Sequence, residues 1–260
     1  GTDGGGLNRL DLESGSFHRY RNDPQNDNSL CSDSVYAVTE DRYGDLWIGT
    51  TSGGVDRFNP ETETFIHNKF DPGNENSIAS NSVWEVFEDS KGNIWLGTAM
   101  GGLNKYDREN NRFIRYKDNP QDPNSIHCDF INQICEDKDG TLWIGTFGGG
   151  INHFDPETGK FSAYTHNPSI QYSLSNDVVN AVFVDREGVL WAGTDSGGLN
   201  KHIHITDKFK HYTNIPTDAT SLSDKNVTAI FMDSEENLWV GTSLGGLNRT
   251  NKESDGFIHY

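Results

Sequence analysis

Short runs of alternating apolar and polar residues, separated by clusters of Gly, Asn, Asp and Pro, continue along the whole chain. Alternation over four to six residues is the period of a half-buried β-strand. Between residues 35 and 68 the pattern predicts four strands, at residues 35–40, 46–50, 55–58 and 64–68. The turn signals Asp41-Arg42-Tyr43-Gly44 and Asn59-Pro60-Glu61-Thr62 separate two pairs of them. No segment of ten residues carries a 3.6-residue period, so we expect an all-β fold.

This four-strand pattern recurs every 48 residues without an insertion or deletion. Its clearest mark is a Trp followed by x-Gly-Thr, at Trp47, Trp95, Trp143, Trp191 and Trp239. Gly1 and Thr2 match the Gly-Thr end of one further copy. Four short antiparallel strands in each repeat are typical of a blade of a β-propeller.

The repeat boundaries predict five complete blades and two strands of a sixth. The two strands lie in residues 1–20, and the blades lie at about residues 35–68, 83–116, 131–164, 179–212 and 227–260. We interpret residues 1–260 as one propeller domain. Because five blades and two strands do not close a ring, we expect the chain to be part of a six- or seven-bladed propeller; alternatively, two such chains complete each other. The sequence has no initiator Met and no apolar leader, so we expect it to belong to a longer protein.

Other sets of equivalent positions, 48 residues apart and called columns here, also have structural interpretations. The five Trp side chains are predicted to be core residues wedged between adjacent blades. Asp41, Asp89, Asp137, Asp185 and Asp233 precede the first turn of each blade and are expected to cap it. Glu236 stands where the other copies have Gly, which predicts a more strained or differently shaped turn. A basic column at residues 9, 57, 105, 153, 201 and 249 is expected to neutralise carboxylates nearby.

Composition narrows the possible partners. The chain has 21 Lys and Arg against 39 Asp and Glu, a formal net charge of −18 that opposes binding to nucleic acid. No apolar run approaches the ~20 residues of a membrane span, so no membrane contact is expected from this segment. Cys31, Cys128 and Cys135 are an odd number at irregular spacing and do not predict a disulfide framework.

Several short motifs are similar to catalytic or metal-binding sequences, but their positions in the repeat explain them better. Asp195-Ser196-Gly197-Gly198 is similar to the nucleophile string of trypsin-like proteases, yet it is one copy of a turn repeated along the chain. His202 and His204 have a spacing that suits zinc, without a third ligand nearby. Asp137-Lys138-Asp139-Gly140 suggests calcium but lacks the downstream Glu. We therefore predict no catalytic residue, no metal site and no cofactor.

Variable positions inside the constant repeat are the candidates for ligand binding. They lie on the loop after the second strand and at the second position of the first strand, on the face that rims a propeller channel. The candidates are Tyr36, Thr51, Ser52, Trp84, Met100, Asn132, Phe147, Asn180, Asp195 and Ser196. Aromatic rings beside amides and carboxylates would suit a saccharide. The alternatives are drift at exposed loop tips and, for Tyr36 and Trp84, packing between blades.

The string V-x-x-I-x-x-D-x-x-G-x-L-W-I-G-T-x-x-G-G-L-N, followed by F-x-x-Y and an N-P…S-L loop, resembles the two-component regulator propeller repeat. The resemblance covers essentially the whole chain. It implies the periplasmic or extracellular sensor of a bacterial hybrid histidine kinase, or of some diguanylate cyclases, whose ligands are often carbohydrate-derived. It also implies a following Ig-like domain, a transmembrane helix and a cytoplasmic output domain. A homodimer formed through the parent protein is a further candidate partner. The fifth blade departs from the pattern at residues 202–205.

The function expected from this resemblance is non-catalytic sensing of a small molecule or oligosaccharide outside the cytoplasm. One alternative is a propeller that serves as a protein-interaction scaffold. Another is an enzyme similar to the streptogramin lyases, which would need a His/Glu cluster on the channel face; the variable loop positions supply neither residue type.

Overall fold

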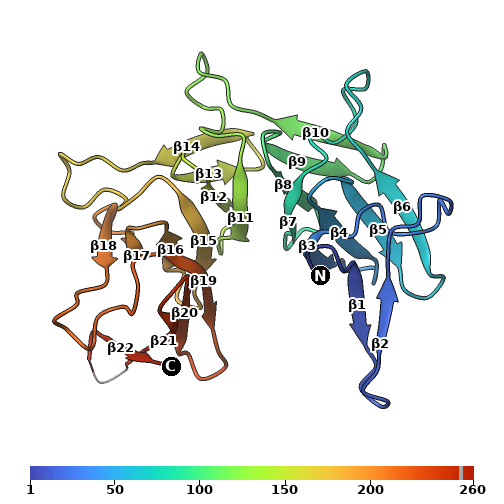
Figure 1. Ribbon diagram of the computed structural model, residues 1–260. Coiled ribbons are helices and arrows are strands. Elements are labelled where there is room, and N and C mark those ends of the chain that lie inside the picture. The colour runs from blue at the N-terminus through green and yellow to red at the C-terminus, as the bar shows by residue number, and fades with distance from the viewer. Residues whose placement is uncertain (252–253) are drawn as a thin grey trace. The chain divides into compact units, whose positions relative to one another are not determined.

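The computed structural model describes residues 1–251 and 254–260, and Figure 1 shows their course. These residues form 22 strands and no helix. Five sheets have four antiparallel strands in sequence order, and one sheet has two strands. Within the described ranges, no helix could cross a membrane. The predicted all-β fold of four-stranded propeller blades with a 48-residue repeat is confirmed; the number of blades in the ring stays a prediction.

The strands follow the sequence pattern closely. The two-stranded sheet contains β1 (Leu7–Leu10) and β2 (Phe17–Tyr20). The next two sheets contain β3 (Val35–Glu40), β4 (Leu46–Thr50), β5 (Val55–Asn59) and β6 (Thr64–Asn68), and then β7 (Val83–Glu88), β8 (Ile94–Thr98), β9 (Leu103–Asp107) and β10 (Arg112–Tyr116). The fourth contains β11 (Ile131–Glu136), β12 (Leu142–Thr146), β13 (Ile151–Asp155) and β14 (Lys160–Tyr164). The last two contain β15 (Val179–Val184), β16 (Leu190–Thr194), β17 (Gly198–Ile203) and β18 (Lys208–Tyr212), and then β19 (Val227–Met232), β20 (Leu238–Thr242), β21 (Gly246–Thr250) and β22 (Phe257–His259).

The chain divides into two compact units. The first consists of residues 1–118 and 129–131, and the second consists of residues 119–128 and 132–260. The first unit holds the two-stranded sheet and the next two blades, while the second holds the last three blades apart from the first residue of β11. The prediction of one domain over residues 1–260 stays a prediction.

The core of each unit forms where one blade packs on the next. In the first unit, Trp47 is fully buried in a cluster with Val83, Val86 and Ile94 of the following blade. In the second unit, Trp191 is buried against Leu222, Val227 and Leu238 in the same way. Trp239, on the second strand of the last blade, is only partly buried.

A carboxylate fixes each of these indoles. The Nε1–H of the five repeated Trp side chains donates to the Oδ2 of the Asp six residues earlier, at 2.7–3.0 Å. The other oxygen of that Asp accepts backbone N–H groups of its own turn, as from Glu187 and Val189 to Asp185. The Asp therefore joins the first turn of a blade to the indole of its second strand, beyond the capping role that the sequence indicates.

Three further columns are explained by the packing. A Cβ at Gly193 would lie 2.3 Å from a side-chain carbon of Val227, so Gly lets the two sheets approach closely. Glu236 has φ of 64°, the left-handed conformation that its Gly counterparts take without strain. The cations of Lys105, Lys201 and Arg249 lie 4.9–5.6 Å from the indole centroids of the Trp residues beside them. This basic column therefore stacks on indoles, in addition to ion pairs such as Arg57 with Asp45 at 3.6 Å.

The long loop that enters a blade is fastened to that same blade at two points. The N–H of Ser175, in the loop before β15, donates to Oδ1 of Asn200 on β17, and Asn200 is fully buried. The carbonyl of Tyr172, in the same loop, accepts the N–H of Phe209 on the outer strand β18. The other described blades of the second unit repeat both bonds with their own residues.

Candidate functional site

Two predicted binding residues in the first unit lie against each other. Tyr36 on β3 and Trp84 on β7 have ring centroids 4.7 Å apart, and Phe130 lies 4.8 Å beyond Trp84. Tyr36 is 58 % exposed, and the other two rings are partly buried. We call Tyr36, Trp84 and Phe130 the aromatic row. Tyr36 and Trp84 each occupy the second position of the first strand in their blades, and the two side chains meet where these blades are neighbours.

Phe130 was missed by the sequence analysis. It stands immediately before β11, in a column where the two preceding repeats have Ser34 and Ser82. That replacement of Ser by Phe is the signal that could have identified it. Ser82 has its own place in the site, because its Oγ accepts the Nε1–H of Trp84 at 2.9 Å and fixes the orientation of the indole.

The predicted binding amides in the second unit are engaged in bonds between blades. Asn132 on β11 donates its Nδ2–H to the carbonyl of Val179 at 2.9 Å. Asn180 on β15 donates to the carbonyl of Val227 at 3.0 Å. Each amide therefore ties the first strand of one blade to that of the next.

The predicted loop residues are distributed over the two units. Thr51, Ser52 and Met100 belong to the first, and Phe147, Asp195 and Ser196 belong to the second. Met100 and Phe147 are 78 % and 58 % exposed, and Met100 and Ser196 have positive φ. Ser52 Oγ lies 3.2 Å from Ser32 Oγ, so this loop contacts the one that enters its blade.

One cluster combines a thiol, an imidazole and a carboxylate. Asp56 is fully buried on β5, accepts the backbone N–H of Cys31 and lies 2.7 Å from Nδ1 of His67. Burial, and then the neighbouring Asp56 carboxylate, raise the pKa of the Cys31 thiol to about 12. Because the thiolate is the nucleophilic form, Cys31 is not activated for covalent chemistry at neutral pH. Asp56 thus holds the loop that enters this blade, as Asn200 holds the loop that enters its own blade.

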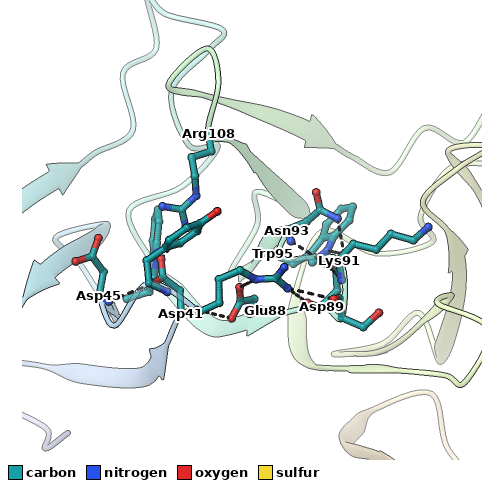
Figure 2. A network of polar contacts seen from close by, with 12 residues as sticks. Asp41, Asp45, Glu88, Asp89, Lys91, Asn93, Trp95 and Arg108 are labelled. Atoms are coloured by element: carbon teal, nitrogen blue, oxygen red, sulfur yellow. Dashed lines mark hydrogen bonds and ion pairs between the residues drawn. The ribbon is translucent and has the colours of Figure 1, made fainter.

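A network of polar contacts joins the turns of the two blades in the first unit, as Figure 2 shows. The guanidinium of Arg108 donates to the buried Asp41 at 2.7 Å and lies 4.5 Å from the centre of the Tyr43 ring. Arg42 forms an ion pair with Glu88 at 2.8 Å. Burial would raise the pKa of Asp41, but the hydrogen bonds from its indole partner and from Arg108 lower it below the ordinary value. This network braces the turns; in the parts of the chain that are described, no group of three or more His, Cys, Asp and Glu side chains could hold a metal ion.

A protein-family model matches five segments of the chain. The model described as "Two component regulator propeller" matches residues 29–52, 77–100, 125–148, 173–196 and 221–243. Each matched segment runs from the loop that enters a blade to the turn after its second strand. No curated protein matches the sequence.

Solved structures share the fold at low sequence identity. The extracellular domain of a hybrid two component system from B. thetaiotaomicron aligns with a TM-score of 0.76 and 23 % identity, over 94 % of this chain and 30 % of the other. The extracellular domain of a one component system from the same organism aligns with a TM-score of 0.59 and 20 % identity, over 100 % and 39 %. Virginiamycin B lyase from Staphylococcus aureus aligns with a TM-score of 0.63 and 15 % identity, over 87 % and 69 %. The chain thus spans about a third of the length of the two extracellular domains.

Proposed function

This chain belongs to the two-component regulator propeller family, and from that premise we propose that it is a non-catalytic, ligand-sensing propeller of a bacterial signalling receptor. The proposal places it outside the cytoplasm, in the periplasm or at the cell surface. It rests on the five in-phase family matches and on the extracellular origin of two proteins that share its fold. In the parent protein, the output would come from a domain such as a histidine kinase or a diguanylate cyclase.

The aromatic row is the observation that supports a carbohydrate-derived ligand. Aromatic faces carry partial negative charge, so they attract the polarised C–H groups on the apolar face of a sugar ring. Tyr36 has most of its ring open to solvent, and Ser82 holds the indole of Trp84 in one orientation. A fixed and partly exposed pair of rings loses little conformational entropy when a ligand stacks on it.

A non-catalytic role is supported by the chemistry of the Cys31 thiol. Cys31 lies beside a carboxylate and an imidazole, yet its raised pKa leaves almost no thiolate at neutral pH. The likeness to virginiamycin B lyase concerns the fold, at 15 % identity. We therefore place binding, and not bond cleavage, at the aromatic row.

Thermal unfolding of the chain in the presence of a panel of oligosaccharides tests this proposal. A ligand at 100 times its dissociation constant adds about 2.7 kcal/mol and raises the midpoint. We expect one glycan class to raise it, and Tyr36→Ala and Trp84→Ala to abolish the shift. Phe231→Ala is the matched control, because Phe231 is 63 % exposed and lies on the first strand of another blade.

Two outcomes would contradict the carbohydrate proposal. One is a panel that leaves the midpoint unchanged, and the other is a shift that survives both row variants. Binding of a protein partner in place of a glycan would favour the interaction-scaffold alternative.

A further inference from the structure

A pocket of about 570 Å³ opens in the second unit beside the outer strand β18. Tyr172 of the loop that enters this blade, Ile203 at the end of β17 and the buried Phe209 line it with apolar groups. Lys208 and Lys210 of β18 also line it, and among its described lining residues none is an Asp or a Glu. The volume is in the range of ~300–1,000 Å³ that is typical of binding pockets.

The turn between β17 and β18 differs from the same turn in the other repeats. At the position of Ile203 the other copies have Asp11, Asn59, Asp107, Asp155 and Asn251. Asp155, for example, caps its turn by accepting the backbone N–H of Glu157 at 2.9 Å. Ile203 has no side-chain oxygen for such a bond and is 40 % exposed. Ile205 is 98 % exposed, where the other copies have Glu. The stability of the turn therefore does not explain these two isoleucines.

The loop that enters this blade differs in the same way. At the position of Ile170 the loops of the other blades have Asn26, Asn74, Asp122 and Asp218. The carboxylates of Asp122 and Asp218 accept the backbone N–H of the residue two positions later, at 3.0 and 2.9 Å. Ile170 cannot form this bond and is 56 % exposed, and Tyr172 is 47 % exposed in a column of Asn and Thr. Loop and turn thus replace polar groups by exposed apolar ones at the same pocket.

The charge at the pocket is opposite to that of the chain, which has 39 acidic and 21 basic residues. Lys210 pairs with Asp255 of the following blade. Asp207, the neighbour of Lys208, is bound instead to the buried His202, with 2.9 Å between Oδ1 and Nε2. Lys208 forms no ion pair within the described ranges. Its ammonium group is therefore available to a carboxylate of a partner.

These features favour a protein segment over a sugar as the occupant. The ammonium group of Lys208 lies 4.9 Å from the centre of the Tyr172 ring, so one face of that ring is already covered. Ile170, Ile203 and Ile205 offer aliphatic groups, which gain free energy by contact with apolar side chains and not with hydroxyl groups. A surface with aromatic residues and few carboxylates is also typical of the centre of a protein interface.

We propose that this pocket and the exposed isoleucines of its loop and turn bind an acidic segment of a partner protein. An apolar side chain of the segment enters beside Tyr172 and Ile203, and a neighbouring Asp or Glu pairs with Lys208. Ile170 and Ile205 extend the apolar contact. The inference does not rest on the proposed carbohydrate ligand, because the aromatic row belongs to the first unit.

The test begins with the selection of random dodecapeptides, displayed as a library, on the immobilised full chain. We expect the enriched peptides to carry a net negative charge and an aliphatic or aromatic residue next to Asp or Glu. The most enriched peptide is then synthesised with a fluorescent label, and its affinity for the chain is measured by fluorescence anisotropy. We expect saturable binding to the wild type.

A double variant removes the apolar site and keeps a sequence that the fold already accepts. Tyr172→Asn with Ile203→Asp introduces the residues that the preceding blade has as Asn124 and Asp155. We expect at least a tenfold loss of affinity for the peptide. The thermal midpoint should not fall, because an Asp caps this turn in the preceding blade.

The charge is tested by Lys208→Glu, which should also weaken peptide binding at least tenfold. Lys160→Glu is the matched control, because Lys160 is the exposed residue of the same column in the preceding blade. It changes the net charge equally and should leave the affinity unchanged. Trp84→Ala should also leave it unchanged, so a failure of the carbohydrate proposal is distinguishable from a failure of this one.

Several results would overturn the proposal. They are a library without an enriched peptide, enrichment of neutral or basic peptides, and an affinity that the double variant or Lys208→Glu leaves unchanged. A thermal shift caused by oligogalacturonate and lost in Lys208→Glu, with no peptide enriched, would assign the pocket to an acidic glycan instead.

Discussion

Replacement of Trp191 by Ala tests how far the packing of consecutive blades stabilises the molecule. The indole is 7 % exposed, and it is enclosed by a cluster that includes Leu199, Leu222 and Phe257. Truncation of a buried Trp to Ala costs about 3–5 kcal/mol, from lost transfer energy and from the cavity that remains. At about 2–4 °C per kcal/mol for a chain of this size, the thermal midpoint should fall by roughly 10 °C.

Trp239 provides the matched control, because it has the same local contacts but is less buried than Trp191. Its Nε1–H donates to Asp233 at 2.7 Å, as that of Trp191 donates to Asp185 at 2.9 Å, and Arg249 lies over its ring as Lys201 lies over that of Trp191. Trp239 is partly exposed. We therefore expect Trp239→Ala to lower the midpoint by less than half as much.

The assay is thermal unfolding followed by far-UV circular dichroism, which does not depend on the indole signal. A third variant, Trp191→Phe, keeps most of the apolar volume and removes the N–H. It should recover more than half of the loss if packing is the larger contribution. Equal losses for Trp191→Ala and Trp239→Ala would refute the reasoning, because they would assign the stability to the Asp bond and the cation, which both sites share.

Three other predictions follow from single positions. Gly193→Ala should lower the free energy of unfolding by about 1–3 kcal/mol, because the added Cβ would overlap the next blade. Gly241→Ala is the control and should leave the urea midpoint unchanged, since the atom nearest to its Cβ would lie 3.4 Å away. Similar losses of stability in the two variants would contradict the close approach of sheets at Gly193. Glu236→Gly should stabilise the chain by about 0.5–1 kcal/mol, since it relieves a left-handed backbone, and a lower melting temperature would show that the turn is not strained. Cys31 should be alkylated by iodoacetamide at pH 8 about a thousandfold more slowly than an ordinary thiol, because its pKa of about 12 in place of 9 reduces the thiolate fraction by that factor. Mass spectrometry of the modified peptides measures this, with the chain in urea as the control; equal rates in the folded and unfolded states would exclude the raised pKa.

The strands were predictable from the sequence because each depends on local information. Alternation of period two and turn residues at fixed offsets give β3 to β6 within one residue, and the 48-residue period carries the result to the other blades. The strained turn at Glu236 was predictable for the same reason, because the other repeats have Gly at the equivalent position and Glu236 takes the same left-handed conformation.

Side-chain partners across the fold were predictable only in part. The constant six-residue spacing from Asp185 to Trp191 was visible, but spacing does not show that the carboxylate reaches the indole N–H, because that depends on the direction of the turn. The basic column was expected beside carboxylates, yet antiparallel register places Lys201 directly opposite Trp191. Asn132 was a candidate ligand residue, and its bond to the next blade depends on a distance between strands 47 residues apart.

The way in which each entering loop is fastened to its own blade has a mechanical consequence. Ser175 and Tyr172 are bonded to β17 and β18, so the loop and the four strands after it close into a ring of contacts within one 48-residue repeat. When the chain is pulled from its ends, the hydrogen bonds between a loop and its own blade resist the force, so each repeat unfolds as a unit. Rupture of these bonds in one repeat releases about 170 Å of extended chain, at ~3.5 Å per residue. An optical-trap record should therefore lengthen in steps of this size, one for each blade.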